Sequence, residues 1–128
     1  MPARKLLVVD DDPDIRRIAA LALERIGGFQ VTVAEDGRGA LEAAARDTPE
    51  LVLLDVSMPG MDGPALLAAL RELEAMANVP VVFFTAASND AEIGRLLKLG
   101  AVGVVPKPFE VAELPRRIHT ILRGLGLD

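Results

Sequence analysis

The chain has 128 residues, 51% of them hydrophobic, and a net charge of −5. This length is typical of one domain, and a domain of this size can bury its own hydrophobic core. It contains no cysteine, so disulfides and thiolate metal sites are excluded, and its acidic balance without Trp or Tyr argues against nucleic-acid binding. No apolar run has the features of a signal peptide or approaches the roughly 18 residues of a membrane span. We therefore expect one domain over residues 1–128, cytoplasmic, with no direct contact to membrane or nucleic acid.

Short apolar runs alternate with amphipathic segments along the chain. The runs predict strands near 5–10, 29–34, 50–55, 80–85 and 102–105, and the segments predict helices near 13–27, 38–47, 63–76, 90–99 and 111–123. Five strands that are each followed by a helix indicate an α/β fold, in which helices cover both faces of a parallel sheet.

Local signals mark the ends of several helices. Asp12 can cap the first helix with Pro13 at its first position, and Asn89 followed by Glu92 resembles a capping box. Glycines occur where helices should stop in a left-handed turn, at Gly27, Gly28 and Gly100.

Pro115 lies within the last predicted helix. Proline in a helix interior costs about 3 kcal/mol but is harmless in the first turn. We therefore expect the regular helix to begin near Ala112 or Glu113, after a loose turn through 109–111.

Polar side chains lie where four of the predicted strands end. Asp10 and Asp11 follow the first strand, Asp55 ends the third, Thr85 ends the fourth and Lys107 follows the fifth. The carboxyl ends of parallel strands share one edge of the sheet, where open α/β proteins bind ligands, so we expect these residues to cluster. A threonine in a strand or a lysine before proline indicates nothing by itself, and only the joint placement points to a site.

The chemistry of this set favours phosphoryl transfer. Neighbouring carboxylates repel each other unless a cation lies between them, and Mg²⁺ prefers carboxylate, water and phosphate oxygens. Beside such an ion, the Asp55 carboxylate can attack phosphorus and form an acyl phosphate. The transferred group carries negative charge, which the Thr85 hydroxyl and the Lys107 ammonium group can stabilise.

Four motifs, in this order and spacing, resemble the receiver domain of bacterial two-component response regulators. They are Val-Val-Asp10-Asp11, Leu-Leu-Asp55-Val-Ser-Met-Pro-Gly-Met-Asp-Gly63, Phe-Phe-Thr85-Ala86 and Lys107-Pro-Phe109. The second motif is highly specific, and the resemblance spans essentially the whole chain. It implies a doubly wound, flavodoxin-like (βα)5 fold with strand order 2-1-3-4-5.

The resemblance also implies a role for each matching residue. Asp55 would be the phosphoacceptor. A divalent ion, Mg²⁺ or alternatively Mn²⁺, would be held by Asp55, directly by Asp11, through water by Asp10 and by the backbone carbonyl of Ser57. Thr85 and the N–H group of Ala86 would bind the phosphoryl group. Lys107 would pair with a phosphoryl oxygen, and the Lys107–Pro108 bond is expected to be cis.

A receiver domain accepts its phosphoryl group from a histidine kinase or phosphotransfer protein and hydrolyses it slowly, so we do not expect a turnover enzyme. The signal would pass to a downstream effector protein that binds the phosphorylated surface, and the domain would be a monomer or weak dimer. We expect a stand-alone receiver domain, the alternative being part of a longer regulator or hybrid kinase.

The sequence departs from the family pattern at some positions. Val104 stands where an aromatic switch residue is common, so signalling cannot use an aromatic flip there. Ser57 and Ala87, which would flank the path of attacking water, are both small and predict ordinary self-hydrolysis.

His119, the only histidine, is expected at the surface of the last helix, and Leu96 and Leu97 are expected in the core.

Two other functions compete with this interpretation. The first is an interaction module of the same fold that has lost phosphorylation, against which the intact polar set argues. The second is an aspartyl-phosphate phosphatase or other doubly wound enzyme, which would carry a second acid where this chain has Ser57. A flavin-binding domain is disfavoured because the acids after the first strand would repel phosphate.

Overall fold

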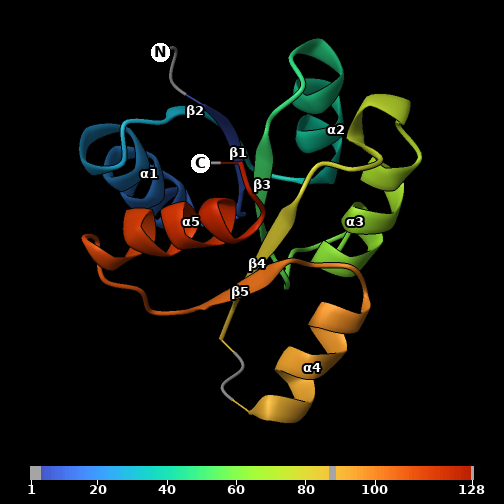
Figure 1. Cartoon of the computed structure of the whole chain (residues 1–128). Helices are drawn as coiled ribbons and strands as arrows, with labels where there is room; N and C mark the ends of the chain where they lie inside the picture. Colours follow the sequence, from blue (N-terminus) through green and yellow to red (C-terminus); the bar gives the residue numbers. More distant parts are fainter. Residues whose placement is uncertain (1–3, 87–88, 128) are drawn as a thin grey trace.

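The computed structural model describes residues 4–86 and 89–127 and contains one five-stranded sheet with helices on both sides (Figure 1). The strands are β1 (Lys5–Val9), β2 (Gln30–Ala34), β3 (Leu51–Asp55), β4 (Val81–Thr85) and β5 (Gly103–Pro106). The α-helices are α1 (Pro13–Leu21), α2 (Gly37–Arg46), α3 (Gly63–Arg71), α4 (Asp90–Lys98) and α5 (Glu113–Gly124). A π-helix, η1 (Ala22–Ile26), extends α1, and a 3₁₀-helix, η2 (Glu74–Met76), follows α3. Within the described part of the chain, no helix is both long and apolar enough to cross a membrane.

All strands of the sheet are parallel, in the order β2-β1-β3-β4-β5. The α/β fold, the five strand–helix units and the predicted strand order are therefore confirmed. The register pairs Val9 with Leu54 and Thr85 with Pro106, so β1, β3, β4 and β5 end close to one level of the sheet. This level carries the polar residues that follow or end the strands.

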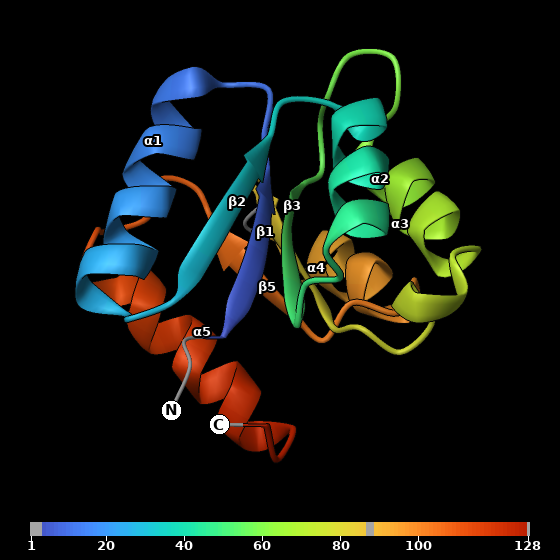
Figure 2. The same cartoon turned by 90° about the horizontal axis from the view of Figure 1, so that it is seen from above.

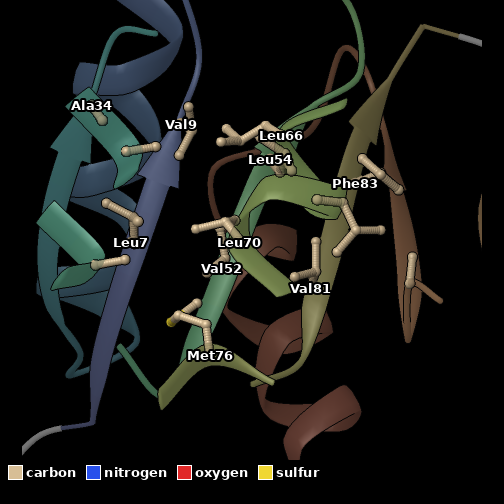
Figure 3. Close-up of a cluster of buried hydrophobic side chains, with 14 of the residues drawn as sticks. Leu7, Val9, Ala34, Val52, Leu54, Leu66, Leu70, Met76, Val81 and Phe83 are labelled. Carbon is tan, nitrogen blue, oxygen red and sulfur yellow. The ribbon is translucent and has the colours of Figure 1, made fainter. Parts of the chain in front are cut away.

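Two apolar clusters cover the faces of the sheet, because alternate residues of a strand point to opposite sides. Seen from above, α1 and α5 lie on one side and α2, α3 and α4 on the other (Figure 2). Leu7 and Val9 of β1 point into the cluster beneath α2 and α3, together with Val52, Leu54, Leu66, Leu70, Met76, Val81 and Phe83 (Figure 3). Leu6 and Val8 point the other way, toward Ala19, Leu23, Ile118 and Leu122.

The predicted helix starts agree with the structure. The Asp12 carboxylate accepts hydrogen bonds from the backbone N–H groups of Asp14 and Ile15, with Pro13 at the first helical position. The Asn89 side chain accepts one hydrogen bond from the backbone N–H of Glu92, which is the first half of the predicted capping box. The Glu92 carboxylate instead accepts hydrogen bonds from Arg95.

The last helix also begins as predicted. α5 starts at Glu113 after a turn, Ala112 precedes it without a side-chain cap, and Pro115 is the third helical residue and buried. Proline is tolerated there because the N–H groups of the first turn have no partner within the helix.

Several predictions were wrong in detail. α1 gives way to a π-helix at Ala22 instead of continuing to residue 27. Gly27 keeps φ −83°, so of the three glycines predicted to end a helix in a left-handed turn, Gly28 and Gly100 do so and Gly27 does not. His119 is half-buried: its ring stacks on Phe29 at 4.6 Å and its Nε2 atom lies 3.0 Å from the carbonyl oxygen of Gly27. Leu96 is buried as expected, but Leu97 is 44% exposed.

Candidate functional site

The predicted polar residues meet at the carboxyl edge of the sheet. Asp10 is completely buried, and Asp55 and Thr85 are only 5% and 4% exposed, which makes them the buried polar residues of the described chain. Asp10 follows β1, Asp55 ends the adjacent strand β3 and Thr85 ends β4. Burying two carboxylates costs free energy unless they are paired, so this cluster requires a compensating cation.

Lys107 supplies a cation within the cluster. Its Nζ atom lies 2.7 Å from Oδ2 of Asp10 and 3.2 Å from Oδ1 of Asp55, and its backbone N–H donates to the carbonyl oxygen of Thr85 at 2.8 Å. The ammonium group also lies 5.7 Å from the centre of the Phe84 ring. The Lys107–Pro108 peptide bond is cis, as predicted. Lys107 thus connects the strand ends through both its side chain and its backbone.

The charges of the cluster alter its proton equilibria. Burial, followed by repulsion from Asp10, raises the pKa of Asp55 to about 6, although Lys107 and the N–H of Ser57 act in the opposite direction. Burial on its own would lower the pKa of Lys107, but hydrogen bonds and attraction to Asp10 and Asp55 outweigh it and raise that pKa above 10.5. At neutral pH, Lys107 therefore stays protonated and the Asp55 carboxyl group is mostly ionised.

Three carboxylates are placed to share a metal ion. One oxygen from each of Asp10, Asp11 and Asp55 can be chosen so that all lie within 4.8 Å of one another. Asp11 is exposed, so this arrangement opens to solvent on one side. An all-oxygen donor set with an open side fits Mg²⁺, which keeps several waters and binds through one or two carboxylates.

The two remaining predicted residues lie beside the cluster. Ser57 is exposed, and its backbone N–H donates to Oδ1 of Asp55 at 3.3 Å. Ala86 follows Thr85 and is exposed. Ala87, the second residue expected along the path of attacking water, lies outside the described residues.

Sequence reasoning missed two contacts that support the site. Nη1 of Arg16, in α1, donates to the carbonyl oxygen of Asp10 at 2.8 Å. Phe109 stacks on Phe84 with 5.3 Å between ring centres and holds the loop after Lys107 against β4. Neither side chain belongs to a strand end, so the rule that located the other residues could not find them.

Gly63 has a role beyond the turn suggested by the sequence. Its N–H donates to the carbonyl oxygen of Val56 at 2.8 Å, which closes the loop after Asp55. A Cβ atom on Gly63 would lie 2.5 Å from the carbonyl oxygen of Asp55 and 2.9 Å from Cε1 of Phe83. The lack of a side chain therefore lets α3 start directly against the strand that carries Asp55.

Known proteins are similar to this chain in sequence and in architecture. The sequence profile of the response regulator receiver domain matches residues 6–119. The chain is 41% identical over 128 residues to the transcriptional activator protein PfeR of Pseudomonas aeruginosa, and 40% identical over 121 residues to the transcriptional regulatory protein CseB of Streptomyces coelicolor. These matches cover 100% and 94% of the chain but only 41% and 50% of the relatives, so the chain spans half of their length or less.

Solved structures similar to this one are also response regulators or their receiver domains. The chemotaxis response regulator CheY4 of Vibrio cholerae superposes with a TM-score of 0.87 at 29% identity, over 94% of this chain and 99% of that one. The receiver domain of NtrX from Brucella abortus gives 0.82 at 32% identity, over 92% and 98%. The profile match over most of the chain, supported by these neighbours, shows that the protein belongs to the response regulator receiver domain family of two-component systems.

Proposed function

We propose that Asp55 accepts a phosphoryl group from a histidine kinase or phosphotransfer protein in a reaction that depends on Mg²⁺ or Mn²⁺. The observation that carries this proposal is the position of Lys107, whose ammonium group lies 2.7 Å from Asp10 and 3.2 Å from Asp55. A phosphoryl group on Asp55 would bring its oxygens to a cation that is already held beside the accepting carboxylate. Electrostatic groups fixed in advance in this way are a main source of catalysis in phosphoryl transfer.

The transfer requires an ionised Asp55. With a pKa of about 6, its carboxylate is mostly deprotonated at neutral pH. A carboxylate oxygen attacks the phosphorus of a phosphohistidine, a P–O bond forms, and the P–N bond to the imidazole breaks. The imidazole keeps the electron pair of that bond and takes a proton from solvent, which leaves an acyl phosphate on Asp55.

The residues around Asp55 would divide the work of stabilising the new group. Asp11, Asp55 and the carbonyl of Ser57 would hold the divalent ion directly, and Asp10 would hold it through water. When bound, the ion would neutralise charge on the phosphoryl oxygens. The hydroxyl of Thr85, the N–H of Ala86 and the ammonium group of Lys107 would bind the same oxygens from the protein side.

Slow self-hydrolysis and output through a partner complete the proposal. Ser57 offers no carboxyl group to activate water, which favours a lasting acyl phosphate over the rapid turnover of a phosphatase. The intact polar set argues against an interaction module that has lost phosphorylation.

The relatives named above are transcriptional regulators as whole proteins of about twice this length or more. For this chain, with its net charge of −5, we propose that the effector is a downstream protein rather than directly bound nucleic acid.

Beryllofluoride, which resembles a phosphoryl group bound to a carboxylate, tests the site without a kinase. Amide shifts recorded with Mg²⁺ and beryllofluoride should change around 10–12, 55–57, 85–86 and 107, and Asp55→Asn should abolish the response. Shifts confined to other surfaces, or an equal response in Asp55→Asn, would exclude Asp55 as the acceptor.

A further inference from the structure

The turn between β1 and α1 is held from both sides of Asp11. Before it, the Asp10 carboxylate accepts the N–H of Asp12 at 2.9 Å, and the Asp10 carbonyl oxygen accepts Nη1 of Arg16 at 2.8 Å. After it, Asp12 caps α1, and its carbonyl oxygen accepts the backbone N–H of Arg16 at 3.0 Å. Arg16 therefore contacts the turn through both its backbone and its side chain.

The carbonyl that Arg16 binds belongs to the peptide unit that joins Asp10 to Asp11. A peptide unit is planar, so fixing the direction of the Asp10 carbonyl also fixes the N–H of Asp11 and the position of its Cα atom. Asp11 is exposed, whereas Asp10 is buried and held by Lys107. The orientation of the exposed acid thus depends on how this one peptide plane is held.

We propose that Arg16 is a positioning residue, which aims the Asp11 carboxylate at the divalent ion by clamping the Asp10–Asp11 peptide plane. This inference rests on the proposed function, because it assigns Asp11 as a metal ligand. Hydrogen bonds with a charged donor are shorter and stronger than neutral ones, and half-buried Arg16 makes such a bond from the end of the first turn of α1.

A purely electrostatic role predicts the opposite effect on metal binding. A positive charge near the acids repels a divalent cation, so removing it should strengthen binding. Loss of the clamp should instead weaken binding, because Asp11 would sample orientations that do not point toward the ion. The two roles are therefore separated by the direction of the change in affinity.

Arg17 provides a matched control. It is the next residue of α1, carries the same charge and is exposed. Arg16→Gln and Arg17→Gln remove the same formal charge, but only the first removes the hydrogen bond to the Asp10 carbonyl. Arg16→Lys keeps the charge and a donor.

The experiment is a Mg²⁺ titration of the three variants and the wild type, followed by amide shifts. We expect Arg16→Gln to raise the Kd about tenfold, the lower end of what losing a group that supports a metal ligand costs. Arg17→Gln should stay within about twofold of the wild type, and Arg16→Lys should recover most of the affinity. Equal Kd values for Arg16→Gln and Arg17→Gln, or tighter binding by Arg16→Gln, would overturn the proposal.

A measurement without metal separates this inference from the proposed function. In the metal-free proteins, the amide signals of Asp11 and Asp12 should move in Arg16→Gln and stay in place in Arg17→Gln. If the wild type bound no Mg²⁺, the metal site itself would be refuted while these signals still reported on the clamp. Unmoved signals in Arg16→Gln would refute the clamp even if the wild type bound Mg²⁺. Urea unfolding of each variant identifies any that fails to fold, and Arg16→Met, which keeps the aliphatic stem but has no donor, then replaces Arg16→Gln with the same expected outcomes.

Discussion

Replacing Asp55 with asparagine is expected to stabilise the metal-free protein at neutral pH. Asp55 is 5% exposed, and burial and repulsion from Asp10 raise its pKa from 3.8 to about 6. Ionising this group in the folded state therefore costs free energy that the unfolded chain does not pay. Since each pKa unit corresponds to about 1.36 kcal/mol, the cost at neutral pH is about 3 kcal/mol, of which asparagine should remove a large part.

The effect has a defined pH dependence. The folded state holds the Asp55 proton more tightly than the unfolded chain, so the stabilisation from this proton is complete below pH 3.8 and is lost as the pH rises through about 6. Asp55→Asn has no proton to lose at this position. Its advantage over the wild type should be small near pH 4 and reach about 2–3 kcal/mol near pH 7.

Urea unfolding in the presence of a chelator, at several pH values between these limits, measures the difference. Asp90→Asn, which changes an exposed aspartate at the start of α4, is the control and should follow the pH profile of the wild type. A difference between Asp55→Asn and the wild type that is the same near pH 4 and near pH 7 would refute the reasoning. So would an Asp55→Asn protein that is less stable than the wild type at neutral pH.

Three further substitutions test the surroundings of Asp55. Lys107→Ala leaves two buried carboxylates without their cation and should cost about 3 kcal/mol of unfolding free energy at neutral pH, measured with urea; a loss below about 1 kcal/mol would contradict the pairing. Gly63→Ala places a Cβ atom 2.5 Å from the Asp55 carbonyl oxygen and should cost about 1–3 kcal/mol, so a stability equal to the wild type would show that the loop yields freely. Val104→Tyr should fold within about 1 kcal/mol of the wild type, because Val104 is half-buried beside a cavity of about 540 Å³ between α4 and β5. In the wild type, Val104 should keep its rotamer when beryllofluoride binds, and a change in step with Thr85 would contradict the absence of a switch there.

The sequence was sufficient for those features that depend on local pattern. Apolar runs located the strands within a residue or two, because strands of a parallel sheet that is covered on both faces are apolar along most of their length. Amphipathic segments indicated the helices between them, because helical periodicity follows directly from helix geometry. The late start of α5 followed from the chemistry of Pro115 alone. Strand ends located the polar cluster, because parallel strands bring their carboxyl ends to one edge of the sheet.

Features that depend on distant contacts were not predictable in this way. His119 is half-buried because Phe29 and Gly27, about ninety residues earlier, pack against α5. Leu97 shares the helical pattern of Leu96 but lies on the rim of α4, where no other described element covers it fully. The hydrogen bond of Arg16 to a backbone carbonyl has no sequence signature, since any residue offers the same acceptor. The motifs thus indicated which residues meet, but the groups that hold those residues in place could be identified only from the structure.

The most direct test of the central claim is whether Asp55 becomes phosphorylated. The protein is incubated with acetyl phosphate and Mg²⁺, and its intact mass is measured before and after mild treatment with hydroxylamine, which cleaves acyl phosphates. The account predicts a mass increase of one phosphoryl group that is lost with hydroxylamine, requires the divalent ion and is absent in Asp55→Asn. An unmodified wild type under conditions in which Mg²⁺ binds, or an adduct that persists in Asp55→Asn, would contradict it.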